Sequence, residues 1–345
     1  MYISDLENLV WMSRVAGGRL DYVQAGGGNT SVKFDDGYMA IKASGYLLKE
    51  MTLNSGFVAV NGAQMKNYYN EEHDAGLDCN KDSMEKAIAS IKQVNGEKQA
   101  RPSVEVGFHS VLQKYVLHLH PVYANVLLCA KDWEQKCRSI FENSDLNCVY
   151  IPYTMPGYGL TKLILDAIEE YEKTTGVFPQ VIFMQNHGVI TTAPTSIEAY
   201  ELMVKANDLI IDALNLSIPP QVAVEEEAEG CVSRNEWLIN ALSDEKIVHA
   251  CKYEALFPDQ LVYLCNDIAL SDNSDGKIVI SNGKILYRAG YNQAVSLEES
   301  LIATVYVLKS IKELGLQANP LSEEDCANIL GWDGEKYRKS LMENR

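Results

Sequence analysis

The stretch YVLHLHP, residues 115–121, is an apolar run that carries two histidines with one residue between them. Its apolar character predicts a strand over 115–120, which ends at Pro121 because proline cannot donate to a central ladder. Residues i and i+2 of a strand point to the same face of a sheet. His118 and His120 can therefore reach one point in space.

A third histidine, His187, lies in the turn-like sequence QNHG, directly after the strand-like segment 181–184. An H-x-H pair alone is often incidental, but three imidazoles from two strands are the ligand type of an open catalytic zinc site. We therefore expect His118, His120 and His187 to bind a metal ion, either Zn²⁺ or another divalent transition metal.

The composition of the chain excludes several classes of protein. Of 345 residues, 47% are apolar and 22% are charged, which is an ordinary globular balance. The net charge of −17 argues against a nucleic-acid surface. No apolar run approaches the roughly 20 residues of a membrane span, and no signal peptide is evident. The eight cysteines form no C-x-x-C pair. We therefore expect reduced thiols, a cytoplasmic location and no nucleic-acid or membrane partner.

A glycine-rich loop, GGGNTS at residues 26–31, ends in small amide and hydroxyl side chains. Such a loop can present backbone N–H groups to a phosphate. A plain tight turn is the simpler interpretation of these residues in isolation, because they match neither the G-x-G-x-x-G nor the P-loop pattern.

The chain divides at a segment rich in proline and glutamate. Before it, Thr195 and Glu198 form a T-x-x-E capping box that opens a predicted helix. The Pro-Pro pair and three glutamates of 217–230 predict a linker. We therefore expect a metal-dependent domain over 1–216 and an accessory α+β extension over 231–345. The pattern predicts these elements in the extension: a helix over 235–242, a strand over 260–265, a hairpin over 277–288 that turns at Asn282-Gly283, and helices over 297–314 and about 323–344.

Taken in order, these segments resemble the class II aldolase/adducin family over roughly residues 1–216. The run GGGNTSVK, residues 26–33, is similar to the family's G-N-x-S loop, which binds phosphate in the zinc aldolases of L-fuculose 1-phosphate and L-rhamnulose 1-phosphate. Its spelling is closest to the aldolase half of the fused rhamnulose-phosphate aldolase/dehydrogenases. The other motifs that carry the resemblance are ASG (43–45), PSVE (102–105), HLHP (118–121), PYTMPG (152–157) and NHG (186–188).

The resemblance implies an α/β fold, namely an α/β/α sandwich around a mixed, largely antiparallel sheet. It also implies a homo-oligomer, usually a tetramer with active sites between subunits. It assigns the three histidines to the metal and Glu105 of PSVE to acid/base catalysis. The residues that it assigns to substrate phosphate are Gly28, Asn29, Thr30, Ser44, Gly45 and Ser103.

The function implied is that of a zinc-dependent aldolase of carbohydrate metabolism, a carbon–carbon lyase that cleaves a ketose phosphate of the deoxy-sugar 1-phosphate type. Retro-aldol cleavage passes through an enediolate whose charge a metal can stabilise as a Lewis acid. Glu105 would move the proton on the nucleophilic carbon. Tyr153 and Tyr158, beside the PYTMPG stretch, are candidate proton donors to the departing aldehyde oxygen.

Alternatives remain at this point, because Val104 stands where the family has a second serine and removes one hydroxyl from the implied phosphate cup. A dehydratase, a decarboxylase or a 4-epimerase of the same family, acting on a sugar phosphate or a sugar acid, is the first alternative. A non-catalytic metal-binding or interaction module is the second. A glutamate rather than an aspartate at position 105 favours the aldolases over the epimerases.

Overall fold

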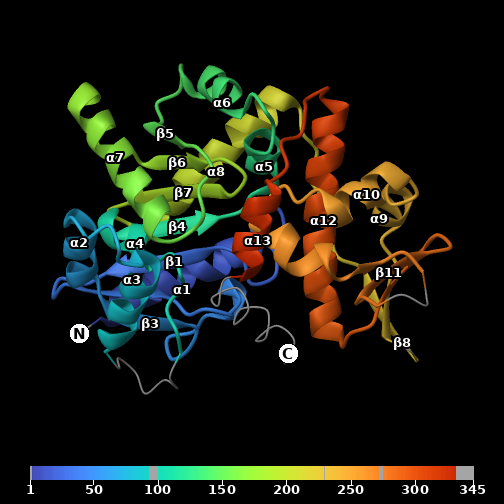
Figure 1. Ribbon diagram of the computed structural model, residues 1–345, viewed down its shortest axis with the longest axis horizontal. Helices are drawn as coiled ribbons and strands as arrows, with labels where there is room; N and C mark the ends of the chain where they lie inside the picture. The colour runs from blue at the N-terminus through green and yellow to red at the C-terminus, as the bar shows by residue number, and fades with distance from the viewer. Residues whose placement is uncertain (1, 93–99, 229, 272–274, 332–345) are drawn as a thin grey trace.

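A seven-stranded sheet forms the centre of the larger part of the molecule (Figure 1). The computed structural model describes residues 2–92, 100–228, 230–271 and 275–331. The strand order is β3-β2-β1-β4-β7-β6-β5, and every neighbouring pair is antiparallel except β5 and β6. The expected mixed, largely antiparallel sheet is confirmed. Its strands are β1 (Asn29–Lys33), β2 (Tyr38–Lys42), β3 (Phe57–Asn61), β4 (Tyr115–Leu119), β5 (Cys148–Ile151), β6 (Val181–Met184) and β7 (Gly188–Ala193).

Helices cover both faces of this sheet, and two separate clusters of buried side chains mark the two layers. One cluster joins Leu117 of β4 to Leu9 and to helices α1, α5, α6 and α8. The other joins Val116 of β4 to Ile164 and to helices α2, α3, α4 and α7. The expected α/β/α sandwich is therefore confirmed. The helices are α1 (Ile3–Gly17), the 3₁₀ turn η1 (Leu48–Glu50), α2 (Gly62–Asn70), α3 (Cys79–Ala89), α4 (Val106–Val111), α5 (Val122–Leu128), α6 (Trp133–Phe141), α7 (Tyr158–Thr175) and α8 (Ser196–Leu214).

Strand β4 is buried on both faces, which explains its continuous apolar sequence. Leu117 and Leu119 pack into the cluster under α1 and α8, whereas Val116 packs into the opposite cluster. His118 shares the face of Val116, and its ring lies 5.6 Å from the ring of Phe108 on α4. The period-two alternation of the strand therefore places this imidazole inside the layer of α4 and α7.

The capping box at the start of α8 is present as predicted. The Thr195 side chain accepts a hydrogen bond from the backbone N–H of Glu198, 3.2 Å away. This bond satisfies one of the N–H groups that the first turn of a helix leaves without an intrahelical partner.

The extension contains a second sheet of five strands in the order β10-β11-β12-β9-β8. Its hairpin β11–β12 turns at Asn282-Gly283, where Asn282 has a φ of 50° and Gly283 a φ of 71°. Both central residues of this turn need a positive φ, so the predicted Asn-Gly hairpin is confirmed. The strands are β8 (Val224–Glu227), β9 (Gly230–Ser233), β10 (Ile268–Ala269), β11 (Ile278–Ser281) and β12 (Lys284–Tyr287).

The strand predicted over 260–265 is wrong. Gln260 ends the short helix α11 (Pro258–Gln260), and the segment η2 (Leu261–Cys265) is a π-helix. All five residues of η2 are buried. A short run that is apolar on every side has no period that separates a strand from a helix, so its sequence is ambiguous.

The segment 217–230, predicted to be a linker, contains strand β8, which pairs along its length with β9. Its sequence is one valine followed by three glutamates, which does not alternate, and three of its four residues are exposed. Exposed edge strands of this kind give little hydrophobic signal, so composition alone favoured a linker. Residues 217–223 have neither helix nor strand.

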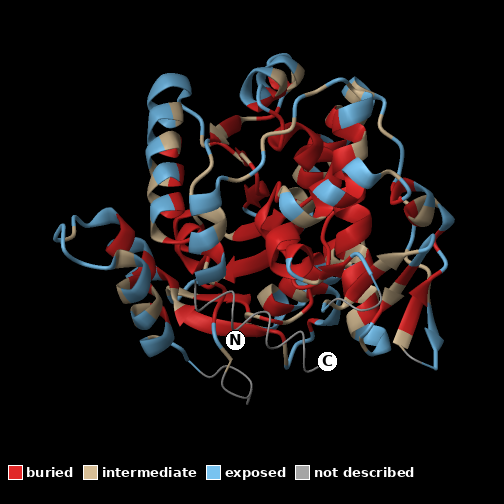
Figure 2. Cartoon of the chain, turned by 45° about the vertical axis from the view of Figure 1, so that its right-hand side comes forward, coloured by how far each residue is buried: buried red, intermediate tan, exposed pale blue. Residues whose placement is uncertain are grey.

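Helix α12 (Tyr291–Glu313) joins the extension to the larger part of the molecule. It begins six residues before the predicted helix over 297–314, and most of its length is buried (Figure 2). It contacts α5, and its buried residues Leu301 and Ile302 belong to the same cluster as Leu117. The extension and the first domain therefore share one hydrophobic core. The other helices of the extension are α9 (Glu236–Ala241), α10 (Glu245–Tyr253) and α13 (Glu323–Gly331). The rest of the helix predicted to about residue 344 lies outside the described residues.

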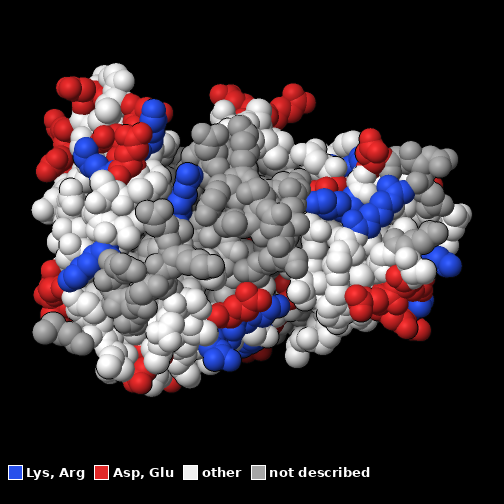
Figure 3. Space-filling view, turned by 90° about the horizontal axis from the view of Figure 1, so that it is seen from below, with Lys and Arg blue, Asp and Glu red and all other residues white. Residues whose placement is uncertain are grey.

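No helix among the described residues is both long and apolar enough to cross a bilayer. All eight cysteines lie within the described ranges, and each is a free thiol. On the face shown in Figure 3, acidic and basic side chains lie in small, separate groups, most of which contain both signs of charge.

Candidate metal centre and active site

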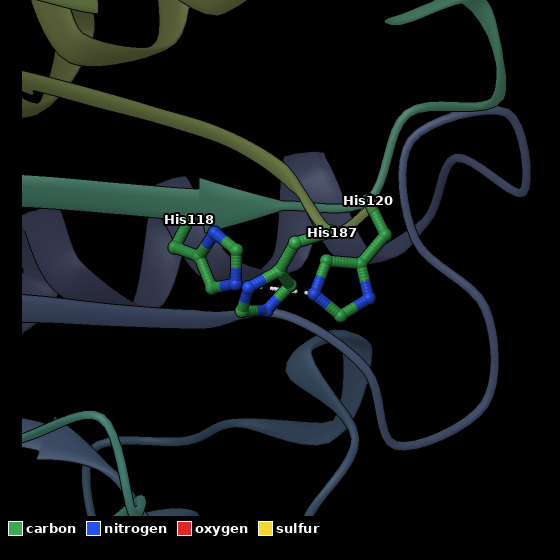
Figure 4. A group of neighbouring side chains, drawn as sticks. All are labelled: His118, His120 and His187. Atoms are coloured by element: carbon green, nitrogen blue, oxygen red, sulfur yellow. Dashed lines mark hydrogen bonds between the residues drawn. The ribbon is translucent and has the colours of Figure 1, made fainter. Parts of the chain in front are cut away.

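The three predicted histidines converge (Figure 4). His118 lies near the end of β4, His120 follows that strand, and His187 lies in the turn between β6 and β7. All three side chains are buried, and one potential ligand atom from each lies within 4.8 Å of the others. The Nε2 atoms of His118 and His120 are 3.1 Å apart.

Two glycines allow the backbone segments that carry the histidines to approach this closely. Gly28 has a φ of 62°, and a Cβ at that position would lie 2.8 Å from the carbonyl oxygen of His118. A Cβ on Gly188 would lie 2.3 Å from the carbonyl oxygen of Leu119. A side chain at either position would push β4 away from its neighbours, so glycine is required there.

The hydrogen-bond partners of the imidazoles define which nitrogens face the centre. His118 Nδ1 lies 3.2 Å from the carbonyl oxygen of Val189, and His120 Nδ1 lies 2.5 Å from a carboxylate oxygen of Asp259. These oxygens only accept hydrogen bonds, so each Nδ1 carries its proton and each Nε2 presents a lone pair. Burial lowers the pKa of His118 to about 3, although Glu105 opposes that shift, so its imidazole is neutral.

The two Nε2 atoms face each other 3.1 Å apart, so their lone pairs repel each other unless a proton or a metal cation lies between them. The donor set therefore fits a divalent metal ion. His118, His120 and His187 would supply three nitrogens, which is the protein ligand number of an open catalytic zinc site.

Glu105, at the N-terminal end of α4, faces the same centre. Its carboxylate oxygens lie 3.5 Å from His118 Nε2 and 3.2 Å from His187 Nε2. A carboxylate is thus held next to the position that a metal would take.

Asn29 connects the glycine-rich loop to this carboxylate. Its Nδ2 donates to Glu105 Oε2 at 2.5 Å and to Ser103 Oγ at 3.1 Å. Its Oδ1 accepts from Nε2 of the buried His109, whose Nδ1 lies 2.7 Å from Ser31 Oγ. Burial lowers the pKa of His109 well below its ordinary value, which keeps the ring neutral. His109 has no motif in the sequence, and the structure identifies it as the group that orients Asn29.

A cavity next to the histidines contains most of the predicted site residues. Those that line it are Gly28, Asn29, Ser44, Gly45, Ser103, Glu105, His120 and His187. They come from separate segments that meet where β1, β2 and α4 adjoin the histidines. The isolated bridge between Ala43 and Pro102 brings the ASG and PSVE motifs together.

Four predicted site residues do not line this cavity. One is His118, whose ring lies 4.9 Å from the rings of His120 and His187. Thr30 Oγ1 lies 2.7 Å from Ser13 Oγ of α1, on the opposite face of the sheet. The Tyr153 hydroxyl is buried, burial raises its pKa, and it has no hydrogen-bond partner among the described residues. The Tyr158 ring stacks on Tyr69 with centroids 5.5 Å apart, within an aromatic group away from the cavity.

Two charged residues that the sequence did not indicate also line the cavity. Lys42 is buried at the end of β2 and donates to the carbonyl oxygen of Gly26 at 3.0 Å. Its place directly before the ASG motif is a signal that sequence reasoning could have used. Asp259 lies on α11, 139 positions after His120, and no local pattern points to it.

Much of the chain is similar to known proteins. The profile of the "Class II Aldolase and Adducin N-terminal domain" matches residues 7–210. A curated relative, the "Uncharacterized oxidoreductase YuxG" of Bacillus subtilis (strain 168), is 26% identical over 226 residues. That match covers 61% of this chain and 30% of the relative, so the chain spans less than a third of the length of that protein.

Two solved structures are also similar. The N-terminal class II aldolase domain of a conserved protein from Thermoplasma acidophilum is 24% identical with a TM-score of 0.50, and the match covers 61% of this chain and 93% of that domain. L-fuculose-1-phosphate aldolase from Thermus thermophilus is 15% identical with a TM-score of 0.38, covering 62% and 95%. The family match includes all three histidines and Glu105, and it spans more than half of the chain. The chain belongs to the class II aldolase and adducin N-terminal domain family.

Proposed function

We propose that this protein is a metal-dependent aldolase that cleaves a ketose phosphate by retro-aldol chemistry. The observation that carries the proposal is the convergence of three imidazoles and the Glu105 carboxylate beside a cavity lined by small donors. When bound, a divalent metal ion, most simply Zn²⁺, supplies a Lewis acid for negative charge that develops on substrate oxygens. His118, His120 and His187 would hold that ion.

Glu105 is the proposed acid/base. In retro-aldol cleavage the hydroxyl on the departing aldehyde carbon loses a proton, and the nucleophilic carbon of the ketone fragment gains one. A carboxylate that accepts the first proton can deliver the second, so the reaction consumes none overall. Of the two carboxylates that line the cavity among the described residues, Asp259 is bonded to His120, which leaves Glu105 for this transfer. The proposed roles of Tyr153 and Tyr158 have no support from their positions.

The substrate phosphate is proposed to lie among Gly28, Asn29, Ser44, Gly45 and Ser103. Backbone N–H groups and small hydroxyls can satisfy phosphate oxygens without a dedicated cationic side chain. Lys42 adds a buried ammonium to the same lining. The positive charge of this ammonium attracts a phosphate and so offsets the loss of the hydroxyl that Val104 removes. It does not replace the directed hydrogen bond of that hydroxyl.

A second candidate is a lyase or decarboxylase of the same family that acts on a sugar acid. Two features of the cavity favour it: Val104 takes the place of a hydroxyl donor, and Lys42 adds a positive charge. A carboxylate needs fewer hydrogen-bond donors than a phosphate, so this lining also suits a sugar acid. Product analysis separates the two candidates, since only an aldolase releases two carbonyl fragments.

The test is turnover by metal-loaded protein on matched substrates: deoxy-ketose 1-phosphates, the same ketoses without phosphate, and the corresponding sugar acids. Elemental analysis should give about one transition metal ion per chain. We expect an aldehyde and a ketone phosphate from a phosphorylated ketose, and none from protein treated with a chelator. Turnover of a sugar acid alone would support the second candidate, and turnover that survives complete metal removal would contradict both.

A further inference from the structure

Residues beyond the family match, which ends at 210, form hydrogen bonds with two backbone segments that carry site residues. Asn186 Nδ2, in the turn that carries His187, donates to the carbonyl oxygens of Leu256 at 2.8 Å and Asn319 at 2.7 Å. Asn186 has a φ of 53°, a conformation that asparagine tolerates better than most residues. The position of the His187 turn therefore depends on residues of the extension.

The glycine-rich loop is held in the same way. The backbone N–H of Ala25, which has a φ of 47°, donates to a carboxylate oxygen of Glu299 on α12 at 2.9 Å. The other carboxylate oxygen of Glu299 pairs with Lys49 at 2.9 Å. Helix α12 thereby fixes the start of the loop that continues into Gly28 and Asn29.

The third contact reaches a proposed metal ligand directly. Asp259 Oδ2 lies 2.5 Å from His120 Nδ1, and the two side chains are 3% and 5% exposed. A Cβ on Gly27 would lie 2.4 Å from Asp259 Oδ2 and 3.1 Å from His120 Nδ1. The second glycine of the GGG run therefore leaves room for this pair.

Asp259 is carried on a rigid turn. The Gln260 side chain donates to the carbonyl oxygens of Ala250, Cys251 and Glu254, and it accepts from the N–H of Leu256 at 2.8 Å. One buried amide thus ties the end of α10 to α11. These bonds fix the backbone next to Asp259, so its carboxylate is presented to His120 from a fixed position.

We propose that Asp259 is a positioning residue for the metal, which fixes the His120 ring so that its Nε2 lone pair points at the ion. This inference rests on the metal site of the proposed function. A carboxylate that accepts from the outer nitrogen of a ligating imidazole fixes its tautomer and orientation and raises its basicity. The extension, which lies outside the family match, would then supply an essential part of the centre.

The burial of Asp259 supports this role over a purely structural contact. A buried carboxylate is unfavourable unless hydrogen bonds and positive charge compensate it. The His120 imidazole supplies one such hydrogen bond. A divalent ion on the far side of the His120 ring would add positive charge, because the ring then carries part of it.

The test measures Zn²⁺ affinity of the full-length protein by competition with a chromophoric chelator. Asp259→Ala should bind Zn²⁺ about 10- to 100-fold more weakly than the unmodified protein. Asp259→Asn keeps an acceptor oxygen without the charge, so its affinity should fall between the two. The matched control is Glu254→Gln, which alters a half-exposed carboxylate of the same segment that pairs with His249. Its affinity should be unchanged.

Two further readouts separate positioning from folding. The absorption spectrum of the Co²⁺-substituted protein should change in the Asp259 variants, and circular dichroism should show each metal-free variant folded. Folded Asp259→Ala and Asp259→Asn with unaltered Zn²⁺ affinity and Co²⁺ spectrum would overturn the inference. Should Asp259→Ala fail to fold, the isosteric Asp259→Asn decides alone. Weaker binding in a protein that cleaves no sugar phosphate would sustain this inference while the proposed function fails, and an unmodified protein that binds no metal would overturn both.

Discussion

The family domain and the extension contribute to the candidate site in different ways. Residues 7–210 supply the three histidines, Glu105 and the small residues of the cavity, all of them within motifs that are visible in the sequence. The extension supplies Asp259 and the groups that hold the histidine turn and the glycine loop, none of which forms a motif. A group that reacts must be of a particular chemical type, so its residue can be recognised in a sequence motif. A group that only orients a reactive side chain needs a hydrogen-bonding atom in the right place, so it leaves little trace in the sequence.

The hydrophobic core also connects the two regions. The division of the chain at 216 and 231 remains a prediction, yet α12 packs its buried residues into the same cluster as β4 and α5. An accessory part that shared only a surface with the first domain would leave two cores. One shared core predicts that the two regions unfold together.

The largest effect is expected from removing a metal ligand in the family domain. His120→Ala should lose bound metal and, with it, at least the roughly 10²- to 10³-fold of turnover that one stabilising group typically provides. Elemental analysis and kcat measure the two losses. The control is His249→Ala, because that imidazole belongs to the extension and is 61% exposed. Unchanged metal content in His120→Ala would remove the site as described.

Glu105→Gln should reduce kcat by about 10²- to 10⁴-fold, the usual contribution of a general acid or base. The amide keeps the size of the side chain but cannot carry the proton. Metal content and melting temperature should change little, which distinguishes this variant from His120→Ala. Glu85→Gln is the control, since Glu85 is 65% exposed and pairs only distantly with Lys81. Near-normal kcat in Glu105→Gln on a confirmed substrate would contradict the assignment.

Leu301→Ala, in the fully buried middle of α12, should reduce the free energy of unfolding by about 2–5 kcal/mol. Because the core is shared, hydrogen exchange should become faster in both the family domain and the extension. Urea unfolding followed by exchange mass spectrometry measures both effects. Ile218→Ala is the control, because Ile218 is 78% exposed and should change stability by no more than about 0.5 kcal/mol. Faster exchange confined to the extension would show two separate cores.

The smallest effect is expected at the cavity wall. Ser44→Ala removes one neutral hydrogen-bond donor from the proposed phosphate cup, worth about 0.5–1.5 kcal/mol. The inhibition constant of inorganic phosphate should therefore rise by roughly 2- to 12-fold. Ser139→Ala on the exposed side of α6 is the control. A Ser44→Ala variant that binds phosphate normally but a sugar acid more weakly would favour the second candidate function.

Local sequence determined the parts of this protein whose pattern lies within a few neighbouring residues. The i, i+2 spacing of His118 and His120 together with the alternation of β4 foretold a buried pair of imidazoles, and the Thr195 capping box and the Asn-Gly hairpin were each found where expected. In these cases the signal lies in neighbouring residues, because strand and helix periods fix side-chain direction within a few positions.

Tertiary structure alone decided the rest, since distant segments decide what a side chain contacts. The run 261–265 is a buried π-helix rather than a strand, and a short, uniformly apolar sequence has no period that separates the two. Tyr158 points into an aromatic group, although its motif placed it near the site. Asp259 meets His120 across 139 positions, and only the packing of α12 and α11 against the first domain brings the two together. The chemistry of the site is thus set by local sequence, and its geometry is a property of the whole fold.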